Sequence, residues 1–468
     1  MNINKVVLIN PYPYYAKGIN EANVTPPLGI TYIAAYLREK IPNINIKIID
    51  ACLLEKSNSK IIEELKIFDP DIVGIYVNII SVKAATELSQ LIKKDLNKLV
   101  VLGGPYVTSQ VERVLFNSKA DAVVRGEGEI TFYEIIKKGN FKDIDGVSYI
   151  KNNNVVHNKN RALIENLDKL PFPALDLLPS LKEYKARARR TPMGFILTSR
   201  GCPYQCTYCN RNIFGNKFRV RSPENIVNEI EHLIKNFGIK ELLIWDDNFT
   251  LDNSRAEKIF DLIIEKRFNL TINLQNGVRA DRLNRELITK MKKAGVYKTG
   301  IGIESGNKEI LKSIKKSLDL EKVKQAIKWF REEGIITIGF FMLGFPEDTK
   351  ETMQDTINFA LETNPSIGNF SIIIPFPGTE LYDLVKSNKW FIHSIEDGSE
   401  TGFLSKNFYF ETNKLKKEDV FAYQKMAYKK FNFRLSKMFE MLMDIRSYNE
   451  FKWTFLTGLN ITKEIILK

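Results

Sequence analysis

The chain has 468 residues, which is enough for two or three domains of ordinary size. Hydrophobic residues make up 44% and charged residues 27%, a composition that excludes a disordered chain, and no apolar run reaches the ~18 residues of a membrane span. The net charge of +13 is compatible with nucleic acid or anionic lipid, but a lysine-rich composition explains it more simply. We therefore expect a cytoplasmic protein with no transmembrane segment, and nucleic acid is the less favoured partner.

Residues 1–140 alternate between short apolar runs and amphipathic helical patterns. This alternation predicts a parallel sheet covered by helices on both faces, whose ligands bind at the carboxyl ends of the strands. The expected strands are Val6–Ile9, Ile44–Ile49, Ile72–Val77, Leu99–Leu102 and Ala122–Val124.

Residues 141–192 are expected to form a connector with a small hairpin, because Asn152-Asn153-Asn154 reads as a turn. Residues 193–385 alternate again and predict a partial (β/α)6 barrel, with its functional loops at the strand carboxyl ends. Residues 386–468 are expected to be mainly helical. The predicted barrel strands are Gly194–Thr198, Glu241–Trp245, Thr271–Gln275, Thr299–Ile303, Thr337–Met342 and Phe370–Ile374.

Three of the four cysteines, Cys202, Cys206 and Cys209, lie in one C-x-x-x-C-x-x-C loop after the first barrel strand. Thiolates bind iron–sulfur clusters, and three of them leave one iron of a [4Fe–4S] cluster open to a substrate. A zinc site would need a fourth ligand, often in a second cysteine pair, and the chain has none nearby. A structural or redox cluster remains the other alternative. Cys52 stands alone and is expected to be a buried residue of the core.

This cysteine loop resembles that of the radical S-adenosylmethionine superfamily. The resemblance continues in loops that follow the later strands: Asp246–Phe249, Asn276–Arg279, Gly302–Gly306, Leu343–Pro346 and Pro375–Thr379. It implies reductive cleavage of S-adenosylmethionine to a 5′-deoxyadenosyl radical, with a reducing electron donor such as flavodoxin or ferredoxin. The residues implied to bind this cofactor are Tyr208, Asp246, Asp247, Asn276, Arg279, Glu304, Ser305, Gly344 and Pro346.

Two of these residues have a specific expected chemistry. Arg279 can pair with the methionine carboxylate, and Glu304 can accept hydrogen bonds from the ribose hydroxyls or the amine. The alternative is that Arg279 and Glu304 form a salt bridge with each other inside the barrel.

The amino-terminal region is similar to the cobalamin-binding domains that are fused to radical enzymes. The resemblance rests on motifs such as Gly103-Gly104-Pro105 and Arg125–Glu129. The contacts that it implies are Asn10, Asn78, Ser81, Gly103, Gly104, Gly126 and Glu127. One departure is that the first 156 residues contain no histidine, so any bound cobalamin lacks a histidine lower ligand.

Together the two resemblances imply a cobalamin-dependent radical methylase that acts on an unactivated carbon of a small molecule, lipid or peptide. A non-methylating radical rearrangement, cyclisation or oxidation is the first alternative, and a nucleic-acid-binding protein with a structural metal is the second. The sequence carries no code for the substrate.

Overall fold

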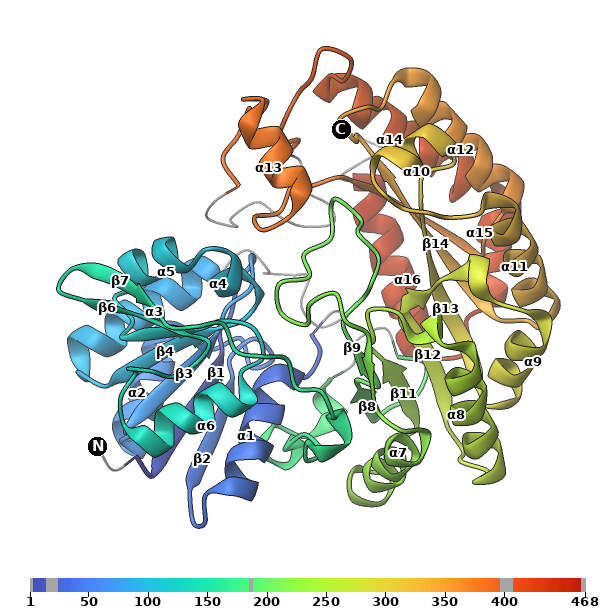
Figure 1. Ribbon diagram of the computed structural model, residues 1–468. Helices are drawn as coiled ribbons and strands as arrows, with labels where there is room; N and C mark the ends of the chain where they lie inside the picture. Colours follow the sequence, from blue (N-terminus) through green and yellow to red (C-terminus); the bar gives the residue numbers. More distant parts are fainter. Residues whose placement is uncertain (1–2, 14–23, 185–187, 396–406, 464–468) are drawn as a thin grey trace. The chain divides into compact units, whose positions relative to one another are not determined.

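The computed structural model describes residues 3–13, 24–184, 188–395 and 407–463. These residues form two compact units. Unit 1 contains the described parts of residues 1–186 together with the segment 210–219, which follows the cysteine loop directly in the chain. Unit 2 contains the described parts of residues 187–209, 220–394 and 402–468. Each unit is built around its own parallel sheet (Figure 1).

Unit 1 has a seven-stranded sheet of order β2-β1-β3-β4-β5-β6-β7, in which the first five strands of the chain run parallel. This confirms the predicted parallel sheet. Because β2 and β3 lie on opposite sides of β1, the chain changes direction at β1 and β3, where ligands of open α/β sheets bind. The strands are β1 (Lys5–Asn10), β2 (Asn45–Asp50), β3 (Ile72–Tyr76), β4 (Leu99–Gly103), β5 (Ala122–Val124), β6 (Val147–Lys151) and β7 (Asn154–His157).

Helices cover both faces of this sheet because successive side chains of each strand point to opposite faces. In β1, Val7 and Ile9 pack into one core cluster with α2, α3 and α5, whereas Val6 and Leu8 pack into the other with α1 and α6. The helices are α1 (Leu28–Lys40), α2 (Asn58–Phe68), α3 (Val82–Asp95), α4 (Pro105–Ser109), α5 (Val111–Ser118) and α6 (Glu129–Lys138).

The predicted hairpin is present as the antiparallel pair β6 and β7. Asn152 and Asn153 form its turn with φ of 51° and 61°. Two consecutive residues of positive φ match the twist of the flanking strands, and asparagine adopts this conformation more readily than most residues. The asparagine run therefore predicted the turn correctly. Three 3₁₀ turns follow, at Leu167–Lys169, Leu175–Leu177 and Leu181–Glu183.

Unit 2 has a six-stranded parallel sheet whose order, β15-β14-β13-β12-β11-β8, follows the chain. Among the described residues β8 and β15 pair with one neighbour each, so the barrel is partial, as predicted. The strands are β8 (Met193–Ile196), β11 (Glu241–Ile244), β12 (Thr271–Val278), β13 (Val296–Glu304), β14 (Ile336–Leu343) and β15 (Ile367–Ile372), with β9 (Ser199–Arg200) and β10 (Arg219–Val220) as short additional strands.

The helices between these strands begin at side chains that accept hydrogen bonds from the first turn. Ser222, Asp252, Asn284, Asp319 and Thr349 cap α7, α8, α9, α11 and α12 in this way. These caps fix where each loop at the strand carboxyl ends stops. The helices are α7 (Pro223–Phe237), α8 (Asn253–Glu265), α9 (Arg285–Lys293), α10 (Lys308–Ser313), α11 (Leu320–Glu332), α12 (Lys350–Thr363) and α13 (Glu380–Ser387), with 3₁₀ turns at Phe249–Leu251 and Ala280–Arg282.

The carboxyl-terminal region is helical, as predicted, with α14 (Lys417–Phe431), α15 (Leu435–Met443) and α16 (Tyr448–Ile461). Helix α14 packs on β15: the Phe431 and Phe370 rings lie 5.9 Å apart, and the Gln424 amide donates to the Phe370 carbonyl at 2.9 Å. Tyr428 and Phe431 are buried, so α14 has an aromatic packing face, whereas Phe439 of α15 is 65% exposed. None of the described helices is long and apolar enough to cross a membrane.

Candidate active site

The three clustered cysteines lie in a loop that leaves the carboxyl end of the barrel sheet after β8 and β9. The loop turns at Gly201, whose φ of 86° is unfavourable for any residue with a Cβ. Cys202 and Cys206 are half-buried and Cys209 is exposed, and all three are free thiols. A loop of this kind presents thiols on one edge of a rigid sheet, where parallel-barrel proteins place their functional groups.

Neighbouring loops hold the cysteine loop from several sides. The Arg279 guanidinium lies over the Tyr204 ring, 3.9 Å from its centroid. The Thr207 amide donates to the Ile314 carbonyl at 3.1 Å, and the Thr207 carbonyl accepts from the Leu381 amide at 2.9 Å. These contacts come from segments that follow β12, β13 and β15, so the thiols are positioned by much of the barrel.

A buried lysine lies beside this loop. Lys316 Nζ is 2.8 Å from Glu304 Oε1 and 3.5 Å from the Tyr208 hydroxyl. The side chains of Lys316 and Glu304 are 13% and 7% exposed. Tyr208 itself interacts with the Cys206 thiol, and burial, followed by the negative charge of Glu304, raises its pKa well above the ordinary value. Lys316 thus places a positive charge between the carboxylate and the cysteine loop.

Four polar atoms at the carboxyl ends of the strands are buried and have no hydrogen-bond partner among the described residues. They are Trp245 Nε1, Asn248 Oδ1, Gln275 Oε1 and Glu304 Oε2. Buried polar groups in proteins are almost always paired, because an unpaired one costs about 1–3 kcal/mol. Trp245 and Asn248 follow β11, Gln275 lies in the last half of β12 and Glu304 ends β13. This is the arrangement expected if a polar ligand completes the site, and S-adenosylmethionine offers amine, carboxylate and hydroxyl groups for this role.

The two aspartates after β11 are bound by the protein itself. Asp246 is 1% exposed and accepts hydrogen bonds from the Thr198 amide at 2.6 Å and from the Ser199 hydroxyl at 2.5 Å. Asp247 is exposed and accepts from the Gly201 amide at 3.2 Å. Both carboxylates therefore brace the start of the cysteine loop, and a role in cofactor binding stays a prediction.

Arg279 and Glu304 do not form the salt bridge that was the alternative to ligand binding. Arg279 makes two hydrogen bonds to Asp281, at 3.0 and 3.1 Å, whereas Glu304 pairs with Lys316. Arg279 is 8% exposed, and its guanidinium is paired with Asp281 and stacked on the Tyr204 ring. The arrangement identifies Glu304 as the better candidate for direct ligand contact of the two.

The remaining predicted residues of unit 2 lie at the same edge of the sheet. Asn276 is exposed, and its side chain donates to the Trp245 carbonyl at 3.2 Å. Ser305 is buried and shares a hydrogen bond with Thr356 at 3.0 Å. Gly344 has a φ of 93°, and Pro346 after it is buried. Their positions at the ends of β12, β13 and β14 suit a ligand pocket, although no described contact identifies what they bind.

The chemistry of the donor set fits an iron–sulfur cluster better than a single metal ion. The described residues contain no group of three histidine, cysteine or acidic side chains that converges tightly enough for one ion. A four-iron cluster separates its thiolate ligands more widely than a single ion does, and it accepts three cysteines in one loop. Free thiols on a braced loop, beside unpartnered polar atoms, therefore suit a [4Fe–4S] cluster with S-adenosylmethionine on its open iron.

In unit 1 two of the predicted residues flank the strands where the chain changes direction. Asn10 ends β1, and its side-chain amide donates to Asp50 Oδ1 at 2.9 Å. Asp50 also accepts from the Tyr184 hydroxyl at 2.6 Å. Asn78 follows β3 and forms a closed turn with Ser81, with reciprocal hydrogen bonds of 3.0 Å between each amide and the other side chain. These turns shape the edge where a cofactor of unit 1 would bind.

The predicted glycines follow the next two strands at the same edge. Gly104, after β4, has a φ of 121°, and a Cβ at this position would lie 2.6 Å from the Val77 carbonyl oxygen. Gly103 precedes it, and Gly126, after β5, has a φ of 71° and donates its amide to Thr108 at 3.1 Å. The loop after β4 therefore requires glycine at position 104 for its own backbone conformation and packing.

Glu127 has a partner that the sequence does not reveal. Its carboxylate accepts two hydrogen bonds from Arg219, at 3.0 and 2.9 Å, and the two side chains are 3% and 1% exposed. This buried pair ties the segment 210–219 to the loop after β5 within unit 1. The role of Glu127 in cofactor binding stays a prediction, and its structural role is plain.

His157 is the one histidine in the sequence of unit 1, and both of its ring nitrogens have partners. Nδ1 lies 2.9 Å from the Ser148 hydroxyl and Nε2 lies 3.0 Å from Glu112. Both contacts hold it on the β6–β7 hairpin and α5. That bound cobalamin lacks a histidine lower ligand stays a prediction.

Fold and site together define a class: an α/β protein that joins an open-sheet nucleotide-type domain to a partial barrel with a three-cysteine loop. Comparison with known proteins is in accord. Residues 196–360 match the radical SAM superfamily, and residues 18–136 match the B12 binding domain. The chain belongs to the radical SAM superfamily and carries a B12 binding domain. Its cofactors are a [4Fe–4S] cluster, S-adenosylmethionine and cobalamin.

Two relatives and one solved structure each match at least four fifths of this chain. An uncharacterized methyltransferase, PH0819, of Pyrococcus horikoshii is 36% identical over 83% of this chain and 84% of the relative. The anaerobic magnesium-protoporphyrin IX monomethyl ester cyclase of Rubrivivax gelatinosus is 26% identical over 81% of this chain and 69% of the relative. The solved structure of the cobalamin-dependent S-adenosylmethionine radical enzyme OxsB, with aqua-cobalamin bound, matches 98% of this chain and 71% of the OxsB chain. The TM-score of 0.77 at 18% sequence identity shows a common fold.

Sequence reasoning missed Lys316, Trp245, Gln275 and Arg219. Trp245 and Gln275 closed two predicted strands, so their position at a carboxyl end was the available signal. Lys316 and Arg219 carried none, because their partners lie 12 and 92 residues away and no motif spans those distances.

Proposed function

We propose that this protein is a radical S-adenosylmethionine enzyme that uses cobalamin to methylate an unactivated carbon of its substrate. The observation that carries the proposal is the unpartnered buried Oε2 of Glu304, whose other oxygen pairs with the lysine beside the three-cysteine loop, together with the unpartnered polar atoms of Trp245, Asn248 and Gln275 in or after neighbouring strands. Similarity to a methyltransferase over more than four fifths of both chains favours methylation.

When bound, the cluster and S-adenosylmethionine supply the 5′-deoxyadenosyl radical, and cobalamin supplies the methyl group. The residues of the chain hold and orient these groups. Cys202, Cys206 and Cys209 ligate the cluster. Glu304 accepts hydrogen bonds through Oε2, which is free to do so, while Lys316 orients the same carboxylate through Oε1.

Arg279 acts on the cluster loop rather than on the ligand directly. Its side chain is fixed by Asp281 and covers Tyr204, which lies between the first two cysteines. This stacking keeps the loop in one conformation and excludes water from that side. The other predicted contacts, from Asn276, Ser305, Gly344 and Pro346, complete the pocket wall. In unit 1 the turns at Asn10, Asn78–Ser81, Gly103-Gly104 and Gly126 form the cobalamin cradle.

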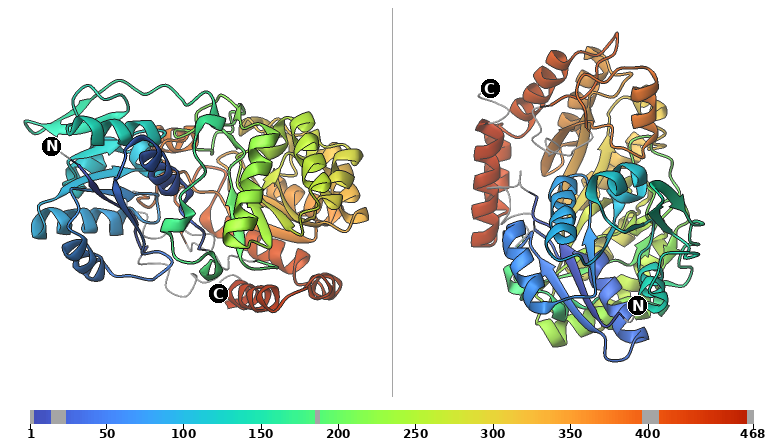
Figure 2. Two further views of the ribbon diagram at one scale, coloured as in Figure 1. Left: turned by 90° about the horizontal axis from the view of Figure 1, so that it is seen from below. Right: turned by 90° about the vertical axis from the view of Figure 1, so that its left-hand side faces the viewer.

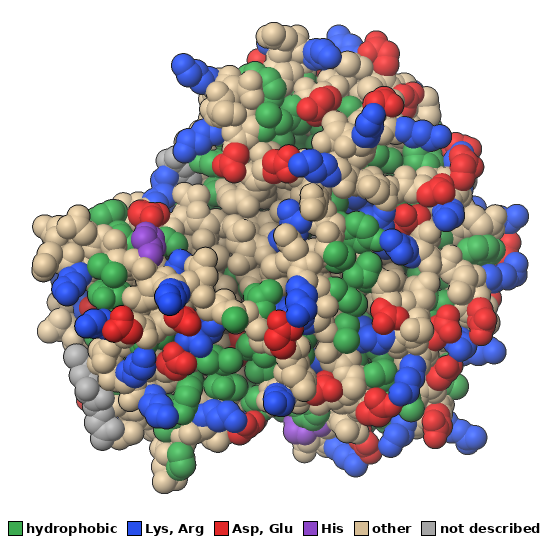
Figure 3. Space-filling model, in the orientation of Figure 1, with side chains coloured by type: hydrophobic (Ala, Val, Ile, Leu, Met, Phe, Trp, Pro, Cys, Tyr) green, Lys and Arg blue, Asp and Glu red, His purple; other side chains and the backbone are tan. Residues whose placement is uncertain are grey.

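The substrate belongs to the small molecules, lipids or peptides, and the chain requires a reducing electron donor such as flavodoxin or ferredoxin. We place the protein in the cytoplasm, because free clustered thiols persist in a reducing compartment. Nucleic acid is a poor candidate for the substrate. On the face drawn in Figure 3 basic and acidic side chains are interspersed, whereas a nucleic-acid interface gathers basic residues along one stripe.

The test is to reconstitute the cluster anaerobically, add cobalamin, S-adenosylmethionine and a strong reductant, and identify nucleoside products by mass spectrometry. Cys206→Ala should lose cluster iron and all 5′-deoxyadenosine. Cys52→Ala is the matched control, because Cys52 is a half-buried cysteine of unit 1 that lies outside the cluster loop, and it should retain both.

Methylation requires S-adenosylhomocysteine in addition to 5′-deoxyadenosine, since the cobalt must be remethylated. 5′-Deoxyadenosine alone, from an enzyme loaded with the cluster and cobalamin, would favour the cyclisation or oxidation alternative. The similarity to a cyclase is the observation that supports this alternative. A Cys206→Ala protein that keeps its iron and its electron paramagnetic resonance signal would contradict the assignment of the cluster ligands.

A further inference from the structure

The two last helices of the chain present large apolar side chains to solvent. In α15 these side chains recur from Leu435 through Phe439 to Leu442, and in α16 from Phe451 through Phe455 to Leu459, each at the three- and four-residue spacing of a helix face. Contiguous exposed stripes of large apolar side chains on a single chain mark interaction sites. The full set, at least 44% exposed, is Leu435, Met438, Phe439, Leu442, Met443, Tyr448, Phe451, Phe455, Leu456 and Leu459.

The inner sides of the same helices are charged. The buried residue of α15 is Lys437, which donates to the Pro365 carbonyl at 3.0 Å and to Glu440 at 2.6 Å. The buried residue of α16 is Glu450. A surface helix normally buries its apolar stripe and exposes its charges, so both helices have the reverse arrangement.

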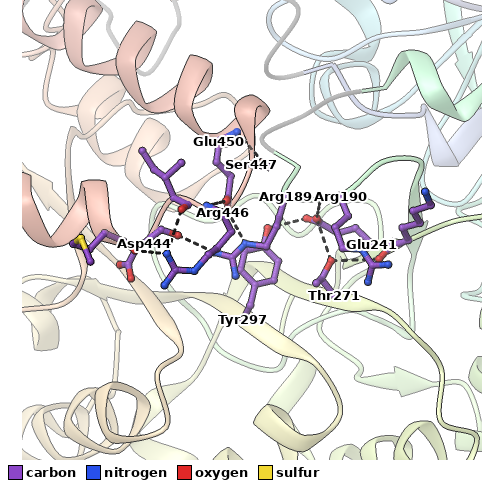
Figure 4. Close-up of polar contacts among 12 residues, drawn as sticks. Arg189, Arg190, Glu241, Thr271, Tyr297, Asp444, Arg446, Ser447 and Glu450 are labelled. Carbon is purple, nitrogen blue, oxygen red and sulfur yellow. Dashed lines mark hydrogen bonds and ion pairs between the residues drawn. The ribbon is translucent and has the colours of Figure 1, made fainter.

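Helix α16 is fixed to unit 2 by polar contacts, as Figure 4 shows. Glu450 accepts from Arg189 at 3.0 Å and from the Arg446 amide at 2.8 Å. Arg189 also donates to the Asp444 carbonyl at 3.1 Å, and its guanidinium lies 4.1 Å from the centroid of the Tyr297 ring. Because the charged side is engaged in this way, the apolar side faces outward, and Figure 2 shows both helices on the outside of unit 2.

The most exposed charges of this outer surface have one sign, and Glu440, whose side chain is 40% exposed, is paired with the buried Lys437. Between residues 435 and 463 the charged side chains that are exposed are Arg446, Lys452 and Lys463, whereas the acidic residues there are buried or half-buried. A symmetric contact between two copies would bring these basic residues together. An anionic lipid surface attracts them, and its interfacial region accommodates aromatic and aliphatic side chains.

We propose that α15 and α16 dock this enzyme on an anionic membrane surface, with their apolar stripes in the interfacial region of the bilayer and no segment crossing it. The inference goes beyond the proposed methylation and does not depend on it, because the surface contains no cofactor ligand. It assigns a binding function to the tail helices, and it favours substrates that are found at membranes.

The test is co-sedimentation of the reconstituted holoenzyme with vesicles of equal parts phosphatidylcholine and phosphatidylglycerol, and with vesicles of phosphatidylcholine alone. The wild type should bind the anionic vesicles at least tenfold more tightly. Phe439→Ser with Phe455→Ser should weaken this binding at least tenfold. The matched control is Ile67→Ser with Phe116→Ser, two apolar residues of unit 1 that are 86% and 55% exposed, and it should bind like the wild type.

A second variant, Lys452→Glu with Lys463→Glu, keeps both apolar stripes and should also weaken binding to anionic vesicles at least tenfold. Thermal unfolding verifies that each variant is folded. Failure of the wild type to sediment with anionic vesicles overturns the proposal, as does a folded Phe439→Ser, Phe455→Ser protein that binds like the wild type. Loss of a concentration-dependent dimer in that variant, without any vesicle binding by the wild type, would assign the surface to a second copy instead.

Discussion

Replacing Lys316 by methionine removes the positive charge beside the cysteine loop while keeping most of the side-chain volume. The Lys316–Glu304 pair is 2.8 Å long and nearly buried, so the attraction between its charges is about 6 kcal/mol at an effective dielectric constant of about 20. Desolvation offsets much of that attraction, and removing one partner of such a pair costs about 3–5 kcal/mol. Since Glu304 Oε2 already lacks a partner, the variant leaves the whole carboxylate unpaired.

The expected consequence is weaker binding of S-adenosylmethionine. If a third to a half of that cost, about 1–2.5 kcal/mol, weakens ligand binding, the dissociation constant rises about fivefold to seventyfold. Equilibrium dialysis on protein with a verified iron content measures this directly, and it does not require turnover. Lys315→Met is the matched control, because the adjacent lysine pairs with Glu380 at the surface, where both side chains are about half exposed. Such pairs contribute about 0–1 kcal/mol, so its dissociation constant should stay near that of the wild type.

Equal affinities of Lys316→Met and Lys315→Met, with both clusters loaded, would refute the reasoning. A double variant, Lys316→Met with Glu304→Gln, separates charge pairing from a direct ligand contact of Glu304. If the pair acts only by keeping Glu304 in place, the double variant binds no more weakly than Lys316→Met. If Glu304 itself contacts the ligand, the double variant is weaker still.

Three further predictions concern stability and cobalamin. Glu127→Ala leaves Arg219 buried without its counter-charge and should lower the unfolding free energy by about 3–5 kcal/mol. The control Glu165→Ala breaks the exposed pair with Lys217 and should change the unfolding free energy by less than about 1 kcal/mol. Similar melting temperatures of the two variants in calorimetry would contradict this prediction. Gly104→Ala should weaken hydroxocobalamin binding in a spectral titration because its Cβ meets the Val77 carbonyl, while Gly29→Ala, which has open space, should not. Burial raises the pKa of Asp348 to about 6 from 3.8, so between about pH 4 and 6 the folded protein holds a proton there that the unfolded chain has released. The protonated Asp348 therefore contributes stability that is full below about pH 4 and is lost as the pH rises through 6. Relative to Asp348→Asn, the wild type should therefore lose about 2 kcal/mol of stability between pH 4.5 and 7.5, and a constant difference in melting temperature would count against it.

Much of the architecture was predictable because it depends on local patterns. Alternating apolar strands and amphipathic helices were sufficient to predict both parallel sheets, and the asparagine turn predicted the β6–β7 hairpin. The cysteine spacing located the cluster loop. These signals lie within a few residues of one another, so a single sequence contains them whole.

Long-range pairs and the tail surface could not be predicted in the same way. Arg219 meets Glu127 across 92 residues, and only the folded chain shows that two charged residues are buried together. The pattern of α15 and α16 predicts an apolar face but does not say that it stays outside. That outcome depends on the buried side chains of Lys437 and Glu450, whose partners are Pro365, Glu440 and Arg189.

The hydrogen-bond partners of the motif residues distinguish residues that support the site from a residue that can bind a ligand. Asp246, Arg279 and Glu127 have protein partners for their charges, so each is stable in place without a cofactor. Glu304 differs, because one carboxylate oxygen is paired with Lys316 and the other is buried without a partner. An unpaired buried oxygen carries a free-energy cost that a ligand can remove by donating to it. For this reason we propose that Glu304, with Trp245 and Gln275, marks where S-adenosylmethionine binds. Asp246 and Arg279 keep that part of unit 2 in place, whereas Glu127 holds the segment 210–219 within unit 1.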